Sequence, residues 1–430
     1  MSNKDLKTKN TNQESVGIRR WFLMATPLAF IGAIILLSRV SVSILISNQQ
    51  FLSDLDLVNR PALAGMLATS YLITYALTQS IWGPIIDKIG PRNTGIVASI
   101  IWALTMAVSG LSTTAGQIII GRIILGVGQG VMFPLFNVYV GNWFPPKERG
   151  RASAFWLNGT TVGPVLSGII VVAMIASGGW RYAFYLHGLI SLLPLIPIIF
   201  LMKEYPSQSK WMSKNEVAYI EAGIKAELQE KGEEEQVIKK DWSFLRDYRF
   251  WILAVIWCST NIYYFGWMTW MPSYFNTARG FSFKTSGLLF SLNWAWSMIT
   301  VAIMGFLQDK FQRRALFSGI AYLITAVAMF IGGNVIKNNY IAMVFIVISV
   351  GCQQPGFLGI HTTFHKTMSK ATLGAAIGFA GMIGSAVGAL APTIAGYILG
   401  ISSYSAVVTL FSSTALICSL LFLFLAKKGY

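Results

Sequence analysis

Charged residues are scarce in this chain, and acidic residues are scarcer than basic ones. Only 12% of the 430 residues are charged, whereas 54% are hydrophobic and the mean hydropathy is +0.58. No ordinary soluble domain has this composition. Cysteine is also rare: Cys258, Cys352 and Cys418 all fall in apolar segments, so we expect them to pack rather than to form disulfides.

Several sequence motifs are missing as well, and each absence argues against one class of protein. No G-x-x-x-x-G-K-[ST] stretch is present, so ATP-driven transport is unsupported. No nucleophile and base pair or acidic dyad lies at membrane depth, which predicts that the protein is not an enzyme. His361 and His365 share a helix face but have no third ligand nearby in the sequence, so we expect no metal and no other cofactor.

A series of long apolar segments dominates what is present. Each segment is near the length of about 20 residues that a helix needs to cross a bilayer. Their continuous apolar character excludes a transmembrane barrel and predicts an all-α polytopic membrane protein with twelve transmembrane helices. The segments are centred on residues 21–47, 62–86, 93–112, 116–141, 150–176, 181–202, 250–275, 284–308, 315–334, 339–363, 371–398 and 404–426.

Basic residues predict how these segments are oriented. Of the 33 Lys and Arg residues, 26 lie in tails and loops that share one side when both termini are placed inside, and five lie on the other side. Because positive loops stay in the cytoplasm, we expect cytoplasmic termini and a location in the cell membrane, either plasma or inner. The same loops explain the net charge of +16 without nucleic acid, and we expect them to contact lipid headgroups.

A long polar stretch divides the segments into two sets of six. Ser213 and Glu216 within it have the spacing of a helix capping box, so a surface helix is expected there. The expected domains are an N-terminal tail (1–20), a six-helix bundle (21–202), a cytoplasmic linker (203–249) and a second six-helix bundle (250–430).

An internal repeat supports this division. "GPIIDKIGPR" (83–92) and "GFLQDKFQRR" (305–314) follow equivalent segments of the two halves, and both read G-x-x-x-D-K. Acids and bases at helix ends form charged clasps that hold one conformation and release it in another. The repeat therefore predicts two halves that rock against each other, with Asp87, Arg92, Asp309 and Arg313 as gating residues.

Over nearly its whole length the chain resembles the major facilitator superfamily. The resemblance is carried by the doubled G-x-x-x-D-K loop, by Arg122 in "GRIILGVGQG" and by the twelve segments with a middle loop. More narrowly, residues 126–152, "GWRYAF" (179–184) and "WMPSYF" (270–275) resemble the anion:cation symporter family, which is known for sugar acids and other organic anions. "GIH" (359–361) and residues 374–388 are similar to the organophosphate:phosphate antiporter family. The resemblance implies two pseudo-two-fold-related bundles and a monomer.

Arg39 lies in the middle of the first apolar segment, in "LLSRVSVSIL" (36–45). Burying its charge in hydrocarbon costs between about 3 and more than 10 kcal/mol, and such charges usually mark substrate pathways. Arg39 either binds a carboxylate or phosphate in a wet central cavity or pairs with polar groups of a neighbouring helix. Both related families have an arginine here that meets the anion, so the resemblance makes Arg39 the first candidate for substrate recognition.

The chain departs from the symporter family at two polar positions. That family usually has a glutamate where this chain has Gln129, and commonly an aspartate where it has Ser38. All seventeen acids lie outside the apolar segments or at their ends, so no carboxylate is left in the membrane core to carry a proton. Arg122, two helical turns before Gln129, is either a coupling residue or a packing support. His361 is the remaining candidate for proton coupling, since the ordinary pKa of histidine suits that task.

The other candidate residues are uncharged. By resemblance, the phosphate exchangers have an arginine at the position of Tyr264 and a lysine at that of Gln79, and losing both charges favours a monoanion over a phosphoryl dianion. Tyr75 occupies a tyrosine position shared by both families and is a candidate hydroxyl donor. Polar groups inside the segments need partners in hydrocarbon, which makes three more residues candidates for the cavity wall: Asn158, Asn293 and Gln354.

One motif favours a different function. Gly150, Gly159, Gly163, Pro164 and Gly168 fit the antiporter motif of drug:proton exporters, although small residues also serve close helix packing. The leading hypothesis is a secondary transporter of a small organic anion, a sugar acid or another carboxylate, that works by alternating access. The alternatives are an exporter of drugs or amphiphiles and an exchanger of organophosphates or other anions. A co-transported proton, a counter-anion and facilitated diffusion all remain open.

Overall fold

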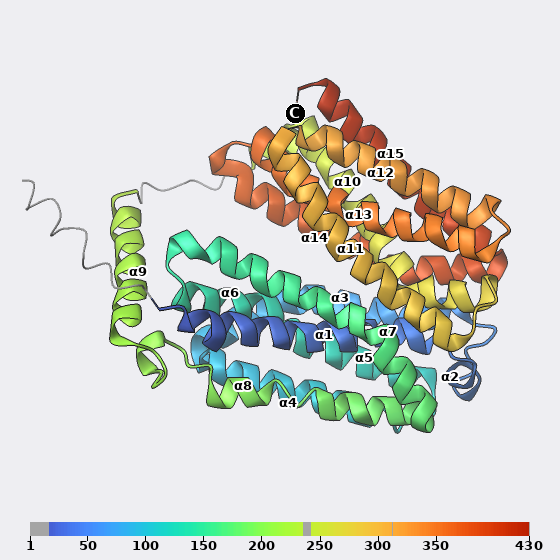
Figure 1. Cartoon of the computed structure of the whole chain (residues 1–430), viewed down its shortest axis with the longest axis horizontal. Coiled ribbons are helices and arrows are strands. Elements are labelled where there is room, and N and C mark those ends of the chain that lie inside the picture. Colours follow the sequence, from blue (N-terminus) through green and yellow to red (C-terminus); the bar gives the residue numbers. More distant parts are fainter. Residues whose placement is uncertain (1–16, 235–241, 312, 430) are drawn as a thin grey trace, which may run out of the picture.

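The apolar segments form helices that lie side by side in two bundles (Figure 1). The computed structural model describes residues 17–234, 242–311 and 313–429, and it describes only the backbone of residues 230–234, 305, 308, 309, 355, 358, 370 and 371. Within that part of the chain, eight helices are long and apolar enough to cross a membrane. The side chain of Asp309, a predicted gating residue, lies outside the described set.

The first bundle begins at Trp21 and ends at Phe200. Its fifth predicted span and the first part of its sixth lie on one long helix, which is kinked at Gly178 and Gly179. Gly179 has a positive φ (+81°), which a residue without a Cβ adopts easily. The elements are η1 (Trp21–Ala25), α1 (Thr26–Leu45), α2 (Gln49–Asp54), α3 (Pro61–Ile89), α4 (Pro91–Ser109), α5 (Ala115–Gln129), α6 (Met132–Trp143), α7 (Pro146–Ile190) and α8 (Leu195–Phe200).

Two segments expected to be continuous are interrupted, and proline explains both interruptions. The segment 116–141 divides into α5 and α6 at Gly130, whose carbonyl cannot receive a helical hydrogen bond from Pro134. The segment 181–202 breaks between Ile190 and Leu195, next to Pro194 and Pro197. Both stretches still lie within helical runs long enough to cross a membrane, Ala115–Trp143 and Pro146–Phe200, so the interruptions are local.

The second bundle repeats the arrangement after residue 242. Side-chain caps begin two of its helices: Asp247 accepts from the backbone N–H of Arg249, and Asn338 accepts from that of Tyr340. The elements are η3 (Ser243–Arg246), α10 (Tyr248–Ser273), η4 (Tyr274–Ala278), α11 (Phe283–Phe311), α12 (Arg314–Phe330), η5 (Ile331–Val335), α13 (Asn339–Thr367), α14 (Lys370–Ile401) and α15 (Tyr404–Lys427).

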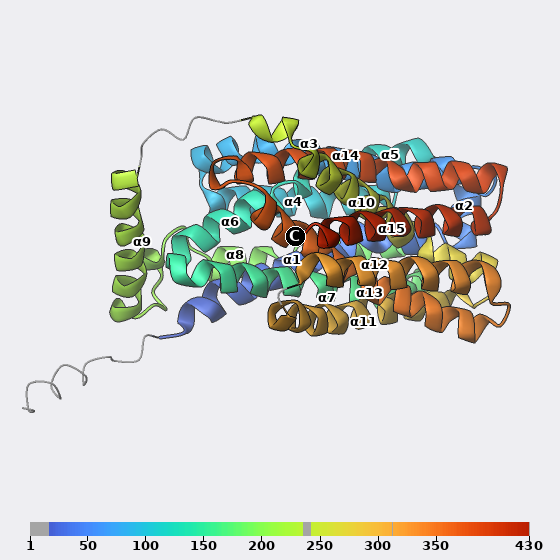
Figure 2. The same ribbon diagram turned by 90° about the horizontal axis from the view of Figure 1, so that it is seen from above.

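A polar helix, α9 (Lys214–Glu234), lies across one end of the molecule (Figures 1 and 2). It follows the short turn η2 (Pro206–Gln208) and starts where the capping spacing predicts, since the Glu216 N–H donates to Ser213 Oγ at 3.3 Å. We call this end of the bundles the α9 end and the opposite end, which carries α2, the far end.

A buried ion cluster binds α9 to the first bundle. Arg20 donates to both carboxylate oxygens of Glu148 at 2.9 Å and to Glu216 Oε1 at 2.7 Å. Tyr219 of α9 also donates to Glu148, at 3.1 Å. A bidentate arginine and carboxylate pair is the strongest geometry for such contacts. The cluster therefore connects three elements: the residue before the first helix, the first turn of α7, and α9.

The two bundles touch at the far end through glycines. A Cβ on Gly65 of α3 would collide with the Pro392 carbonyl of α14, and one on Gly168 of α7 would collide with the Gly287 carbonyl of α11. Thr393 also donates to Thr69 at 2.9 Å across the same interface. Only residues without a side chain permit backbones to approach this closely. The far end is therefore closed.

The same helices stand apart at the α9 end. Added Cβ atoms on Gly83 of α3 and on Gly374 and Gly378 of α14 would meet no described atom of another element within 4 Å. The ribbons of the two bundles accordingly diverge toward α9 in Figure 1. The two bundles are thus packed together at the far end and diverge toward the α9 end (Figure 1).

Candidate functional site

Arg39 lies between the two bundles on α1 and is largely enclosed by tyrosines of α3. Its Nε donates to the Tyr71 hydroxyl at 2.8 Å, and its guanidinium carbon lies 4.2 Å from the centre of the Tyr75 ring. Its Nη2 is buried and has no hydrogen-bond partner among the described residues. The Nε–H is thus held in place, and neither Nη group has a hydrogen-bond partner among the described residues, so both are left for a ligand.

The two tyrosines hold Arg39 because their spacing places them on one face of α3. Tyr71 and Tyr75 are four residues apart, and their rings stack with centres 5.8 Å apart and planes 17° from parallel. The face of an aromatic ring attracts a cation. The buried Tyr75 hydroxyl makes no hydrogen bond of normal length among the described residues, although it lies close enough to Arg39 to interact with the guanidinium.

A one-way chain of hydrogen bonds runs from Arg39 through uncharged groups. The Tyr71 hydroxyl donates to Gln129 Oε1 at 2.7 Å, and Gln129 Nε2 donates to Ser38 Oγ at 2.8 Å. Ser38 then donates to the carbonyl of Ile35 at 2.9 Å. The two positions where this chain departs from the symporter family are therefore bonded to each other. We call Ser38, Arg39, Tyr71, Tyr75 and Gln129 the Arg39 cluster.

Arg122 of α5 lies behind this cluster and contacts only backbone oxygens and a ring. Its guanidinium donates to the carbonyls of Leu67 at 3.1 Å, Arg39 at 3.0 Å and Ser38 at 3.4 Å. It also lies 4.7 Å from the centre of the Tyr71 ring. These bonds tie α5 to α1 and α3, so the geometry favours the packing role over the coupling role.

The charge balance of the site is strongly positive. Both arginines are in contact with Tyr71, and no carboxylate is among the described partners of either. A cation–π contact returns about 0.5–2 kcal/mol and a hydrogen bond to a charged group about 1.5–3 kcal/mol. These contacts therefore match the lowest estimates of the cost of burying Arg39, about 3 kcal/mol, and fall short of the highest, more than about 10 kcal/mol. An anion is the natural remaining partner.

The second bundle faces the cluster with aromatic rings. Tyr264 of α10 interacts electrostatically with Arg39 and Tyr75. Its ring meets that of Trp294 of α11 edge-on, with centres 5.8 Å apart. The buried Trp294 Nε1 has no described partner. The site thus combines a cationic wall from one bundle with an aromatic wall from the other.

Four predicted cavity residues are not joined to this cluster by any described contact. Asn158 is exposed on α7 and donates to the carbonyl of Ala154, and Asn293 is fully buried on α11 and donates to that of Leu289. Gln79 and Gln354 are half-buried and have no polar partner in the described part of the chain. Polarity inside an apolar segment did not reveal which way each residue faces.

His361 lies in an aromatic setting on α13. Its half-buried ring is 5.0 Å from that of Trp257 and 5.5 Å from that of Phe357, measured between ring centres. No described hydrogen bond or ring contact connects it with the Arg39 cluster. A role for His361 in coupling stays a prediction.

Three of the predicted gating residues, Asp87, Arg92 and Arg313, are not joined to one another by any described contact. Asp87 is exposed and has no ion-pair partner among the described residues. Arg92 donates to the carbonyls of Ile198 at 3.4 Å and Ile199 at 2.9 Å. Arg313 is exposed and borders a hollow of about 480 Å³ with Lys366 and Lys427. An unpaired Asp87 fits an end that is open.

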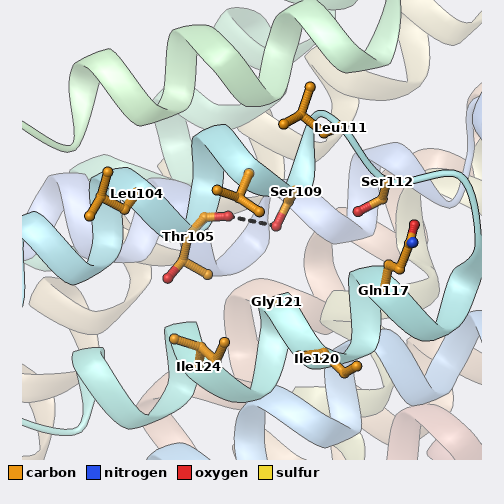
Figure 3. A pocket seen from close by; sticks show the side chains of 10 residues that line it. Leu104, Thr105, Ser109, Leu111, Ser112, Gln117, Ile120, Gly121 and Ile124 are labelled. Carbon is orange, nitrogen blue, oxygen red and sulfur yellow. Dashed lines mark hydrogen bonds between the residues drawn. The ribbon is translucent and has the colours of Figure 1, made fainter.

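A separate groove of about 400 Å³ lies between α4 and α5 (Figure 3). Its wall is mostly aliphatic, with the exposed Leu104, Val108 and Ile120, and Ser109 bonds back to the Thr105 carbonyl of its own helix. Gly121 lies in this wall, whereas the next residue, Arg122, is buried against α1 and α3. None of the predicted site residues lines the groove.

Sequence reasoning missed two members of the site. Tyr71 joins Arg39 to Gln129, and a search for residues one helical turn from the chosen Tyr75 would have found it. Trp294 was overlooked because aromatic residues in membrane helices are common and usually pack. Only the meeting of α10 with α11 shows where it lies.

The profile of the Major Facilitator Superfamily matches residues 28–392. The chain belongs to this superfamily. The expected fold and family are thereby confirmed, and the chain is an integral membrane protein of a family of transporters. The helical arrangement agrees: a bacterial homolog of the human lysosomal transporter Spinster superposes with a TM-score of 0.75 and 17% identity, over 96% of this chain and 97% of that one.

Two curated members of the superfamily are similar in sequence. A probable sulfoacetate transporter of Cupriavidus necator is 27% identical over 62% of this chain and 60% of its own length. The hexuronate transporter of Bacillus subtilis is 25% identical over 86% of this chain and 85% of its own. The match therefore spans less than two thirds of the first relative and most of the second.

Proposed function

We propose that this superfamily member is a secondary transporter of a small organic anion and that Arg39 binds the carboxylate of its substrate. The buried Nη2 of Arg39, which has no described partner, is the observation that carries this proposal. A carboxylate accepts charge-assisted hydrogen bonds from a guanidinium. The free hydroxyl of Tyr75 is the second donor at the same place.

The similar transporters support an anionic substrate. Sulfoacetate and hexuronates are small organic anions, and both carry a carboxylate. A hexuronate has one negative charge on an otherwise neutral sugar, which fits a site where one cationic side chain, Arg39, has Nη groups without a described partner. We infer that a monoanion of this kind is the substrate.

The aromatic wall supports the same substrate class. Tyr264 interacts with Arg39, and its ring contacts that of Trp294, whose buried Nε1 has no described partner; neither residue adds charge. Rings of this kind pack against the C–H faces of a sugar or against another ring. The neutral body of the substrate would lie there while Arg39 holds the carboxylate.

The two ends of the molecule support transport by alternating access. The far end is closed by Gly65, Gly168 and Gly287, and the α9 end is open. We propose that the α9 end faces the cytoplasm, because the basic loops lie there. The bundles would rock about the Arg39 cluster and expose it to each side in turn.

The glycine motif of α7 does not require an export function. Added Cβ atoms on Gly159 and Gly163 would collide with Ala29 and Ala33 of α1, and one on Gly168 would collide with Gly287. Close packing of α7 against two helices therefore accounts for three positions of the motif. The exporter remains an alternative without a structural observation in its favour.

Ligand-induced shifts in melting temperature test this proposal. Purified protein is melted with D-glucuronate, sulfoacetate, benzoate, glucose 6-phosphate or neutral glucose, and Arg39→Gln and the control Arg60→Gln are treated alike. Arg60 is exposed and paired only with Asp56. A ligand at 100 times its Kd stabilises the native state by about 2.7 kcal/mol. We expect a monocarboxylate to stabilise wild type and the control but not Arg39→Gln.

Two other results would contradict the assignment of Arg39 to substrate binding. If the Arg39→Gln variant is stabilised as much as wild type, Arg39 does not bind the substrate. If only cationic or neutral amphiphiles raise the melting temperature, the exporter hypothesis takes first place.

A further inference from the structure

The Arg39 cluster carries charge but contains no group that exchanges protons near neutral pH. The titratable groups that face Arg39 are Tyr71 and Tyr75 from α3, Arg122 from α5 and Tyr264 from α10. On α7, the buried His187 interacts with Arg122 and has no described contact with Arg39. Phenols and guanidinium groups ordinarily keep their protons at pH 7. The described residues around Arg39 therefore offer no site that gains or loses a proton when an anion binds.

The hydrogen-bond chain is also saturated. The Arg39 Nε–H, the Tyr71 O–H, a Gln129 N–H and the Ser38 O–H are each used once, and the chain ends on a backbone carbonyl. Every link except Arg39 is neutral. The net charge of the cluster is therefore positive when the site is empty and changes only when an anion arrives.

We propose that this transporter is an obligatory exchanger, which moves one monoanion outward for each monoanion moved inward and couples no proton. The inference rests on the proposed function, because it assumes that Arg39 binds the substrate anion. It adds the mode of coupling, which the sequence left open between proton symport, exchange and facilitated diffusion.

The reason is electrostatic. In alternating access, the site passes from one side to the other through a state in which both ends are closed and water is excluded. An empty carrier would bring the unpaired charge of Arg39 into that state, whereas a loaded carrier brings a neutral pair of guanidinium and carboxylate. The loaded carrier therefore reorients faster than the empty one, and return requires a second anion.

An acid at the cluster would remove this electrostatic obstacle. An ionised carboxylate beside Arg39 would pair with it in the empty carrier and would accept a proton when the substrate displaces it. Gln129 and Ser38 occupy the two positions where such an acid would reach the cluster, and they are bonded to each other instead. The exchange mode follows from these two neutral residues.

Efflux from liposomes tests the proposal. Vesicles containing the purified full-length protein are loaded with radiolabelled D-glucuronate and diluted into buffer with or without unlabelled D-glucuronate, at equal pH and with the potential held at zero by potassium and valinomycin. We expect external glucuronate to raise the efflux rate at least tenfold. We also expect neither a pH gradient nor a potential to drive accumulation, since one-for-one exchange moves no net charge.

A gain of function gives the sharper test. In the Gln129→Glu variant the new carboxylate can accept from Tyr71 and Ser38 and can pair with Arg39. We expect net efflux without external anion to increase at least fivefold over wild type and the vesicle interior to become more alkaline, because each anion leaves with one proton. Ser38→Asp is the second variant and should act in the same direction if Gln129→Glu does not fold.

The matched control is Gln117→Glu on the same helix. Gln117 is exposed, and its Oε1 accepts from the backbone N–H groups of Thr113 and Thr114, which a carboxylate can also do. This variant should keep the wild-type dependence on external anion.

The outcomes separate the two proposals. Wild-type efflux that is equally fast without external anion overturns exchange and leaves anion transport standing. Accumulation driven by a pH gradient also overturns exchange, and its loss in His361→Gln would assign the proton to that histidine. If wild type shows neither efflux nor a melting shift with any anion tested, the proposed function fails and the exchange mode falls with it.

Discussion

The guanidinium of Arg122 is hydrogen-bonded to the main-chain carbonyl of Arg39, with 3.0 Å between Nη2 and the oxygen. One buried arginine thus holds the backbone of the other in place. The remaining donors of Arg122 reach Leu67 and Ser38, so a single side chain connects three helices. The two intramembrane arginines have different tasks, since one supports the site and the other has a donor free for a ligand.

Replacing Arg122 should therefore reduce stability first. In Arg122→Lys a single ammonium group cannot reach three carbonyls in a fork, and we expect the free energy of unfolding to fall by about 2–3 kcal/mol. Thermal melting of the purified variant measures this loss. Arg60→Lys, at an exposed site, is the control and should melt like wild type. An unchanged melting temperature in Arg122→Lys would contradict the supporting role.

The two tyrosines should respond differently to loss of their hydroxyl groups. Tyr75→Phe removes a hydroxyl that has no described partner, so we expect unchanged stability and anion affinity that is weaker by about fivefold to tenfold. Tyr71→Phe leaves both Arg39 Nε and Gln129 Oε1 without a partner, so stability and affinity should both fall. Melting curves and titration calorimetry on each variant separate the effects. Equal stability losses in the two variants would refute this distinction.

Glycines at the two ends should control which side is open. Gly65→Leu should prevent closure of the far end and favour the conformation closed at the α9 end, whereas Gly378→Leu should have the opposite effect. The labelling rate of a cysteine introduced at Gln79, in protein without its three native cysteines, reports on the α9 end. We expect slower labelling in Gly65→Leu and no slowing in Gly378→Leu. The reverse order would show that these contacts do not close the far end.

The ion cluster at the α9 end should make stability depend on pH in the acid range. Burial alone would raise the pKa of Glu148, but hydrogen bonds from Arg20 and its charge outweigh burial and hold that pKa below its ordinary value. A carboxyl group with a lowered pKa stabilises the fold above its unfolded value, near about 4.3, and this contribution is lost as the pH falls through the folded pKa.

Melting between pH 7 and pH 3.5 measures this contribution. We expect the melting temperature of wild type to fall as the solution is acidified below the ordinary carboxyl range, and Glu148→Gln to start lower and to fall less. A parallel decline in both proteins would show that other groups control acid sensitivity.

Local signals in the sequence predicted the membrane-spanning helices and the first candidate residue of the site, Arg39. The length of an apolar run can be read from the sequence without knowing its neighbours, and that length predicts a membrane-spanning helix. A lone arginine in such a run is easily noticed, because burying its charge costs much free energy. It is harder to predict which way a side chain faces around its helix. Asn158 and Asn293 were chosen for polarity alone, yet one is exposed and both bond within their own helices.

The residues that depend on contacts between helices could not be predicted in the same way. Tyr71 matters because α3 and α5 place its hydroxyl between Arg39 and Gln129, and no spacing within α3 reveals the second contact. Gly65 was not identified because its partner is a backbone atom of the other bundle, and Gly168 was identified only as part of a glycine motif, without its partner on α11. Proline positions, by contrast, were visible, and reading Pro194 and Pro197 as helix breaks would have predicted the division between α7 and α8.

The ion cluster around Arg20 also has a consequence for biosynthesis. Arg20 and Glu216 are 196 residues apart in the chain. At about 5–20 residues per second, a ribosome completes Arg20 roughly 10–40 s before it completes Glu216. Glu148 follows Arg20 by 128 residues, so Arg20 lacks both carboxylate partners for most of that interval and lacks Glu216 alone for the rest of it. The first bundle is therefore sealed at this end only when α9 has been made, which is still before the second bundle begins to leave the ribosome.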